Sequence, residues 1–238
     1  MTIKDLLSQR YGQNTKLTPL NSGTRKQVYI AETNEKKFII MVNKQKSLRY
    51  QYRSFISNNI QMNLAKRGFC APYVIDFFYL SEGQTVACHT YIEGQQIEHI
   101  DAQIAYKIGQ TVAEFHLAAF YPLKIYLKQP LGYQFYHFIQ ISKNFFRNLR
   151  HEITDSKWHK LPKGICHYDL NLTNFIFSGN NTYLIDYDRQ RYWPFADELR
   201  RFLKNKENQK YAKDFLQGYN SIRQLNKEEQ EFLEKFIH

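Results

Sequence analysis

The chain has 238 residues, of which 43% are apolar and 16% aromatic, with only 10 glycines and 6 prolines. A chain of this length can bury about 70% of its unfolded surface, so the composition excludes a disordered or collagen-like protein. Its uninterrupted apolar runs, such as residues 38–42, are at most five residues long, far shorter than the ~20 residues of a membrane span. The formal charge of +11 favours anionic partners, namely nucleotides, phosphorylated or acidic sugars, nucleic acid or an anionic membrane, without choosing among them.

The cysteines and the amino-terminal residues indicate the cellular compartment in which the protein works. Cys70, Cys88 and Cys166 are widely spaced and contain no CxxC pair, which favours a reducing compartment and argues against a zinc site. The first seven residues include charged side chains and lack the apolar core of a secretion signal. We therefore expect a cytoplasmic protein.

The first half of the chain is rich in predicted strands. Residues 28–31 and 38–42 flank a polar turn, which predicts an antiparallel hairpin. A helix is expected over residues 54–66, ended by Gly68. Two further strands are expected over residues 73–80 and 85–92.

The period of the apolar residues changes after Asp101, which is placed to cap a helix. Apolar residues recur there at three- and four-residue spacing, as one face of a buried helix requires. Residues 164–188 predict strands and loops, and two helices are expected at the carboxyl end. The last helix follows Asn226, with Glu229 placed for a reciprocal cap. Strands followed by helices indicate an α+β fold with a small β-rich lobe before a larger helical one.

One segment carries most of the chemical information. Residues 165–177 read ICHYDLNLTNFIF, an H-x-D-x-x-x-x-N pattern running into an apolar strand, and residues 183–188 read YLIDYD, ending in D-x-D. Phosphoryl transfer requires a group that accepts the proton of the attacking hydroxyl and metal ions that neutralise the phosphate oxygens. Asp169 suits the first role, and Asn174 and Asp186 suit Mg²⁺ through hard oxygen ligands. Asp188 is a further metal candidate, and the alternative is that it satisfies backbone donors in a turn.

This segment resembles the catalytic and metal-binding loops of the aminoglycoside phosphotransferase and choline kinase family, which is related to the protein kinases. Residues 91–94 (YIEG) resemble the family's hinge, residues 108–116 (IGQTVAEFH) resemble one of its helices, and residues 188–201 resemble relatives that act on lipopolysaccharide sugars or occur in spore coats. The resemblance covers roughly residues 20–220. It implies a bilobal protein-kinase-like fold, with a nucleotide-binding lobe over residues 1–91, a hinge at 92–94 and a catalytic lobe over 92–238. It also implies ATP and Mg²⁺ as cofactors, nucleotide contacts from Tyr91 and Glu93, and a structural role for His167 beside the catalytic loop.

The resemblance fails at the nucleotide clamp. The family's third strand carries a lysine for the phosphates, but aligning residues 38–42 with that strand puts Met41 at the position. No acidic residue lies between Glu35 and Asp76, so the glutamate that normally pairs with the lysine is missing too. Three explanations remain open: a cation from Arg25 or Lys26 beside the Gly23 turn, an alignment shift that makes Lys44 the lysine, or a pseudokinase. Strand geometry puts Lys37 on the same face as Met41 but ~13 Å away.

The charge of the expected acceptor region favours an anionic substrate. Residues 121–163 contain eight lysines and arginines against two acidic residues, whereas choline and aminoglycosides are cations. Arg189 and Arg191 add guanidinium groups suited to carboxylate or phosphate, with pairing to Asp197 or Glu198 as the alternative. Aromatic residues of this region, Trp158 among them, suit either sugar stacking or a core.

We therefore expect an ATP-dependent kinase that phosphorylates a hydroxyl of a small molecule, with a sugar or anionic sugar derivative favoured. The alternatives are a choline or aminoglycoside kinase, a pseudokinase, or a basic protein that binds nucleic acid or an anionic surface through residues 44–53. No nucleic-acid motif accompanies that basic stretch, so nucleic acid is the weaker expectation. The oligomeric state is not predicted.

Overall fold

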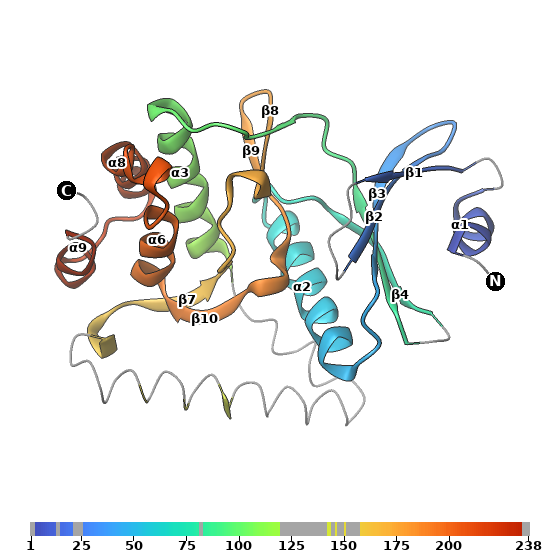
Figure 1. The fold of residues 1–238 in the computed structure, drawn as a ribbon, viewed down its shortest axis with the longest axis horizontal. Helices are drawn as coiled ribbons and strands as arrows, with labels where there is room; N and C mark the ends of the chain where they lie inside the picture. The colour runs from blue at the N-terminus through green and yellow to red at the C-terminus, as the bar shows by residue number, and fades with distance from the viewer. Residues whose placement is uncertain are drawn as a thin grey trace.

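A computed structural model of the chain describes residues 3–12, 15–20, 26–80, 83–119, 142–143, 146, 150 and 158–234. Its amino-terminal part is a five-stranded antiparallel sheet in the order β1-β2-β3-β5-β4 (Figure 1). The strands are β1 (Lys16–Leu20), β2 (Lys26–Glu32), β3 (Lys37–Asn43), β4 (Val74–Tyr79) and β5 (Thr85–Thr90). Helix α1 (Ile3–Tyr11) and helix α2 (Leu48–Lys66) lie on either side of this sheet.

The two faces of the sheet pack differently because strand side chains alternate. On one face Phe38, Ile40 and Val42 of β3 are buried with Leu7 of α1 in a small apolar cluster. On the other side, Tyr52, Phe55 and further residues of α2 belong to a larger cluster shared with the carboxyl-terminal part. Helix α2 therefore joins the sheet to the rest of the molecule.

The rest of the described chain is mostly helical, and its short strands form two small sheets. The helices are α3 (Ala102–Ala118), α6 (Phe195–Leu203), α7 (Lys206–Gln209), α8 (Ala212–Ile222) and α9 (Lys227–Leu233). Strands β7 (Lys163–Cys166) and β10 (Arg191–Pro194) pair with each other, and β6 (Gln95–Gln96), β8 (Phe175–Ser178) and β9 (Asn181–Leu184) form the second sheet. Single 3-10 turns occur at η1 (Trp158–Lys160), η2 (Leu172–Asn174) and η3 (Tyr187–Arg189). The result is an α+β, bilobal protein-kinase-like fold, as expected.

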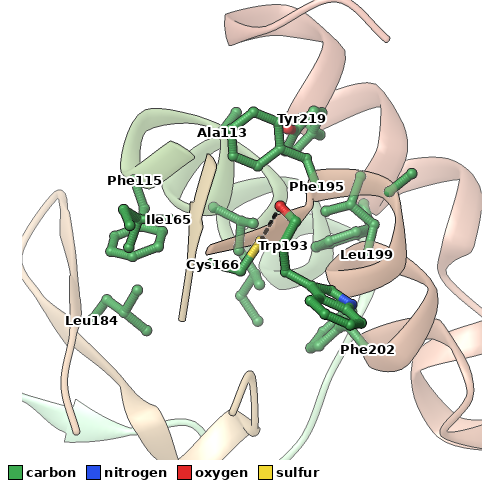
Figure 2. Close-up of a cluster of buried hydrophobic side chains, with 14 of the residues drawn as sticks. Ala113, Phe115, Ile165, Cys166, Leu184, Trp193, Phe195, Leu199, Phe202 and Tyr219 are labelled. Carbon is green, nitrogen blue, oxygen red and sulfur yellow. Dashed lines mark hydrogen bonds between the residues drawn. The ribbon is translucent and has the colours of Figure 1, made fainter. Parts of the chain in front are cut away.

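Two glycines allow α3 and α8 to pack closely. A Cβ on Gly109 of α3 would lie 2.1 Å from the carbonyl oxygen of Phe215, and a Cβ on Gly218 of α8 would lie 2.0 Å from that of Tyr106. Neither position has room for a side chain. This close packing supports the apolar cluster around Phe115, Cys166 and Phe195 (Figure 2).

The structure confirms several expected elements and corrects others. Asp101 caps α3 by accepting a hydrogen bond from the Ile104 backbone, and Asn226 and Glu229 form the reciprocal cap of α9. The helix expected over residues 54–66 begins earlier, at Leu48, because Tyr52 and neighbouring residues gain burial that their local pattern did not reveal. The prediction of two carboxyl-terminal helices is wrong, because the described residues contain four helices after β10. Helix α1 and strand β1 were not predicted. Within the described residues, no helix is long and apolar enough to cross a membrane.

Candidate active site

Lys26 joins the sheet to the D-x-D segment. Its Nζ lies 2.9 Å from Oδ1 of Asp186 and 2.6 Å from Oδ2 of Asp188. Burial lowers the pKa of the Lys26 ammonium, but the two carboxylates more than offset this effect, so its pKa lies above the ordinary value. Burial acts to raise the pKa of Asp186, and Lys26 overcomes it, so this carboxyl has a lowered pKa and is ionised. The three side chains form a charged cluster at the junction of the two parts of the fold.

The strand register explains why Lys26 reaches this position. Lys26 pairs with Asn43, and Val28 pairs with Met41, so Lys26 and Met41 lie on the same face of the sheet, diagonally across β2 and β3. Both line a small cavity with Asp186 and Asp188. Lys37 instead pairs with Glu32 at an exposed position. Lys26 therefore supplies a positive charge beside Met41, the position at which the family carries its lysine.

The helix that borders this cavity contributes neutral side chains. Ser57, Asn58 and Gln61 of α2 line it, consistent with the absence of acidic residues from this stretch. Asn58 contacts the buried His89 of β5, and Gln61 donates to the Pro72 carbonyl. The negative partners of Lys26 therefore come from the D-x-D segment rather than from α2.

The loop that carries Asp169 is connected to the D-x-D segment by two hydrogen bonds. The Ile185 backbone nitrogen donates to the Asn174 carbonyl at 2.9 Å, and Nε2 of His167 lies 3.0 Å from the Ile185 carbonyl. The side-chain nitrogen of Asn174 donates to the Asp169 carbonyl at 2.8 Å. Asn174 Oδ1 has no hydrogen-bond partner among the described residues, so it is available as a ligand. The H-x-D-x-x-x-x-N loop and the residue before Asp186 are thus in direct contact.

Burial determines the protonation state of His167. Its side chain is fully buried, and burial lowers its pKa although Glu198 and Asp186 act in the opposite direction. The imidazole is therefore neutral at neutral pH and donates from Nε2 to the Ile185 carbonyl. This contact is what a residue that braces the loop would make.

Two residues of the site have left-handed backbone conformations. Tyr168 has φ 64° and Asp186 has φ 63°, and they are the only non-glycine residues with positive φ in the described part of the chain. Such conformations are uncommon for non-glycine residues and persist only when the surrounding structure holds them. Both lie at the predicted site, since Tyr168 directly precedes Asp169 and Asp186 is itself a predicted metal ligand.

Glu198 of α6 holds the strained loop from beneath. Its Oε2 accepts from the His167 backbone nitrogen at 3.2 Å and lies 2.7 Å from Nε2 of His116, and its Oε1 accepts from the Tyr168 backbone nitrogen. Glu198 is 1% exposed. Burial acts to raise its pKa, but His116 and the other donors overcome this effect, so the pKa is lowered and the carboxylate stays charged.

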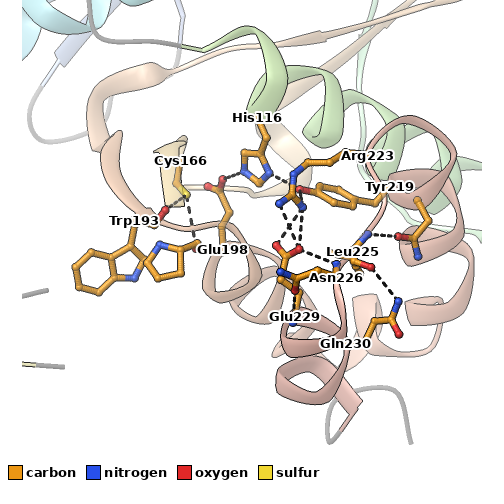
Figure 3. Close-up of polar contacts among 12 residues, drawn as sticks. His116, Cys166, Trp193, Glu198, Tyr219, Arg223, Leu225, Asn226, Glu229 and Gln230 are labelled. Atoms are coloured by element: carbon orange, nitrogen blue, oxygen red, sulfur yellow. Dashed lines mark hydrogen bonds and ion pairs between the residues drawn. The ribbon is translucent and has the colours of Figure 1, made fainter. Parts of the chain in front are cut away.

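The network continues from Glu198 to α9 (Figure 3). Nδ1 of His116 lies 2.7 Å from the Tyr219 hydroxyl, Arg223 donates to that hydroxyl, and Arg223 also pairs with Glu229. The sequence pattern did not predict this network, in which Glu198 was expected only as an alternative partner of Arg189 or Arg191. The signal for it lay in residues 108–116 and 188–201, two segments that resemble the family and contain His116 and Glu198.

His116, Cys166 and Glu198 bring potential metal-ligand atoms within 4.8 Å of one another. Each is already engaged: both nitrogens of His116 have partners, Glu198 accepts from the loop, and Cys166 Sγ lies 3.4 Å from the Trp193 carbonyl. The group is a hydrogen-bonded cluster within the core.

The other predicted site residues are placed as follows. Arg189 Nη1 lies 3.4 Å from Oδ1 of Asp169, and the Arg191 guanidinium lies over the Tyr168 ring. The alternative that Arg189 pairs with Asp197 or Glu198 is wrong, because Arg189 pairs with Asp169, Asp197 bonds Trp193 and Arg200, and Glu198 holds the loop. The same alternative for Arg191 stays a prediction.

Tyr91 and Glu93 lie in the irregular segment after β5. This segment runs against β8, since a Cβ on Gly94 would lie 2.2 Å from the Phe177 carbonyl oxygen. Gly23 and Arg25 lie outside the described residues, as does most of the basic stretch 121–163. Trp158 is 6% exposed and packs edge-on against Trp193, so it belongs to the core and is not a sugar platform.

A bilobal protein-kinase-like fold, with an H-x-D-x-x-x-x-N loop bonded to a D-x-D segment, defines a phosphotransferase of the kinase-like class. The profile of the phosphotransferase enzyme family matches residues 16–230, and the chain belongs to that family.

Solved structures agree on the fold. Spectinomycin phosphotransferase APH(9)-Ia, in complex with ADP and spectinomycin, superposes with a TM-score of 0.64 at 16% identity, covering 99% of this chain and 84% of that one. A microcompartment-associated aminopropanol kinase gives 0.66 at 14%, covering 99% and 85%. An aminoglycoside phosphotransferase from Alicyclobacillus acidocaldarius gives 0.63 at 13%, covering 98% and 82%. The comparison with curated proteins gives no match.

Proposed function

We propose that the protein transfers the γ-phosphate of ATP to a hydroxyl of a small, sugar-like molecule. The observation that carries the proposal is the cluster of Lys26, Asp186 and Asp188 next to the Asp169 loop. The superposed structures include phosphotransferase complexes with ADP and with AMP-PNP, which supports ATP as the donor. Residues 1–91 would bind the nucleotide and residues 92–238 the acceptor, with Tyr91 and Glu93 near the adenine.

Lys26 takes the role of the missing lysine of the third strand. A phosphate clamp needs a positive charge that stays protonated, and the raised pKa of Lys26 satisfies this requirement. Asp186 and Asp188 hold the ammonium in place without an acidic residue from α2. A phosphate oxygen would then replace part of this coordination when the nucleotide binds.

The carboxylates of Asp186 and Asp188 and the free Oδ1 of Asn174 are a donor set that fits Mg²⁺. When bound, the metal would supply positive charge to the phosphate oxygens. Asp169 would accept the proton of the attacking hydroxyl and orient it, and the neutral His167 would keep the loop aligned with Asp186. Arg25 and Gly23 remain candidate nucleotide contacts.

The test is calorimetric titration of Mg·ATP into the wild type and four variants. We expect Lys26→Gln and Asp186→Asn to lose affinity by at least about tenfold, because each removes one charge-assisted contact. Lys37→Gln, which removes an exposed charge from the same sheet, is the matched control and should bind like the wild type. Asp169→Asn should bind nucleotide normally and lose turnover. An absence of Mg·ATP binding to the wild type would rule out the kinase and leave a pseudokinase.

A further inference from the structure

We propose that Lys26 competes with the divalent metal ion for the carboxylates of Asp186 and Asp188, so that the metal enters the site only together with the nucleotide. This inference rests on the proposed function, because it concerns the order in which the ligands of the same site bind. The observation behind it is that the ammonium bridges the two side chains that are expected to hold the metal.

Two short ion pairs hold the Lys26 side chain. Its Nζ lies 2.9 Å from Oδ1 of Asp186 and 2.6 Å from Oδ2 of Asp188. The Lys26 side chain is 20% exposed, whereas those of Asp186 and Asp188 are 42% and 35% exposed. The carboxylates are therefore accessible to an ion from solution, while the ammonium between them is shielded from water and is screened less by salt than a surface charge.

A metal ion that binds these carboxylates meets the ammonium. Mg²⁺ binds carboxylate oxygens at about 2.0–2.1 Å and demands nearly ideal octahedral geometry. Whichever carboxylate oxygen it selects, its two positive charges come next to the charge of Lys26, and the charges repel each other strongly in a partly buried site. Lys26 must therefore leave the carboxylates before the metal binds them well.

The composition of α2 makes this competition a property of the present chain. In kinases whose lysine pairs with a glutamate of the neighbouring helix, the lysine has a negative partner outside the metal site. Residues 36–75 contain no acidic residue, and α2 lines the cavity with Ser57, Asn58 and Gln61. Among the described residues, Lys26 forms ion pairs with the D-x-D segment alone. A metal ion that binds by itself would thus displace Lys26 without giving it a new carboxylate.

A nucleotide removes the competition because it brings its own negative charge. Its phosphate oxygens give the Lys26 ammonium a new partner and at the same time give the metal further oxygen ligands. Asp186 and Asp188 are then released to the metal, together with Asn174. Linkage makes the effect reciprocal, since the nucleotide raises the affinity for the metal by the factor by which the metal raises the affinity for the nucleotide. The metal therefore binds and leaves with the nucleotide.

The experiment measures Mn²⁺ binding to the full-length protein without nucleotide, from the electron paramagnetic resonance signal of the free ion. Mn²⁺ is the probe because it takes the same oxygen ligands as Mg²⁺. We expect Lys26→Gln to bind Mn²⁺ about 5- to 150-fold more tightly than the wild type, the range typical of coupling between sites. The gain should disappear when Asp186→Asn is added to Lys26→Gln, because the metal then loses a carboxylate.

Two control variants separate this competition from a change in net charge. Lys26→Arg keeps the positive charge at the site, and Lys37→Gln removes an exposed charge from the same sheet. Both should bind Mn²⁺ as weakly as the wild type. The inference is overturned if Lys26→Gln binds Mn²⁺ no more tightly than Lys37→Gln does, with circular dichroism showing that each variant is folded.

Nucleotide binding gives a second measurement, which needs no variant. Titration of AMP-PNP into the wild type with and without Mn²⁺ should show much tighter binding with the metal, and an unchanged affinity would overturn the inference. The same titration reports on the proposed function separately. A wild type that binds AMP-PNP, combined with a Lys26→Gln variant that gains no Mn²⁺ affinity, would refute the competition and leave the kinase proposal intact. Tighter Mn²⁺ binding to Lys26→Gln in a protein that binds no AMP-PNP would support the competition and refute the kinase.

Discussion

Replacing Glu198 with glutamine keeps the shape of the side chain and removes both its charge and one acceptor oxygen. In the native protein, Oε2 serves His116 and the His167 backbone nitrogen, while Oε1 serves the Tyr168 backbone nitrogen. Glutamine has one oxygen, and its amide group donates on the other side. Whichever way it is oriented, at least one buried N–H group loses its acceptor and faces another donor.

The expected cost follows from these contacts. Leaving one buried donor unsatisfied costs about 1–3 kcal/mol, and weakening the remaining charge-assisted bonds adds to it, so we expect a loss of about 3 kcal/mol. In a chain of this size, 1 kcal/mol corresponds to about 2–4 °C in Tm, which predicts a decrease of about 6–12 °C. Because the same bonds hold the backbone before Asp169, kcat should fall more than tenfold even at temperatures where the variant is folded.

Thermal unfolding followed by circular dichroism, together with ADP release under Mg·ATP, measures both effects. Glu207→Gln is the control, since Glu207 is exposed and pairs only with Lys210 among the described residues. If Glu198→Gln changed Tm and kcat no more than this control, the buried carboxylate would not hold the loop and the reasoning would fail.

Two further predictions concern stability. Burial lowers the pKa of His89 to about 3, below the ~6.5 of an unfolded histidine, so its contribution is complete above pH 6.5 and is lost as the pH falls towards 3, by about 1.4 kcal/mol per pH unit. The free energy of unfolding of the wild type, measured in urea between pH 7 and 5, should therefore fall more steeply than that of His89→Gln, and equal slopes would contradict the assignment. Gly218→Ala should cost about 3 kcal/mol in the same assay, because the new methyl would meet the Tyr106 carbonyl, whereas Gln217→Ala on the exposed side of α8 should change little. A stable Gly218→Ala protein would show that α3 and α8 can separate at little cost.

The elements with strong local signals were predictable. The caps of α3 and α9 and the hairpin of β2 and β3 follow from a few neighbouring residues whose chemistry decides the conformation. Helix α2 shows the opposite case, because its first turns contain basic and aromatic residues with no clear period. Tyr52 becomes helical through burial against distant parts of the chain, and that burial cannot be read from residues 48–53 alone.

The site residues also fall into two groups, those that a local motif predicts and those that only the fold places. Asp169, Asn174 and Asp186 occupy the characteristic spacings of one motif. Their proximity could therefore be predicted from the sequence. Lys26 was one of three named candidates for the missing cation, with Arg25 and Lys44, and only the strand register decides that it lies on the face of Met41.

Glu198 and Arg201 lie three residues apart on α6 yet serve opposite sides of the Tyr168 segment, one buried beneath its backbone and one exposed over its ring. The pattern of polar and apolar residues along a helix marks both residues as polar. It cannot tell which of the two is buried. Tyr168, which has a left-handed backbone conformation, donates its backbone N–H to Glu198, and the Arg201 guanidinium lies over its ring. One residue with a left-handed backbone thus contacts both the buried network around Glu198 and an exposed arginine. Because the contact with Glu198 is made by the Tyr168 backbone and the contact with Arg201 by its ring, Glu198→Gln and Arg201→Gln change the two contacts separately.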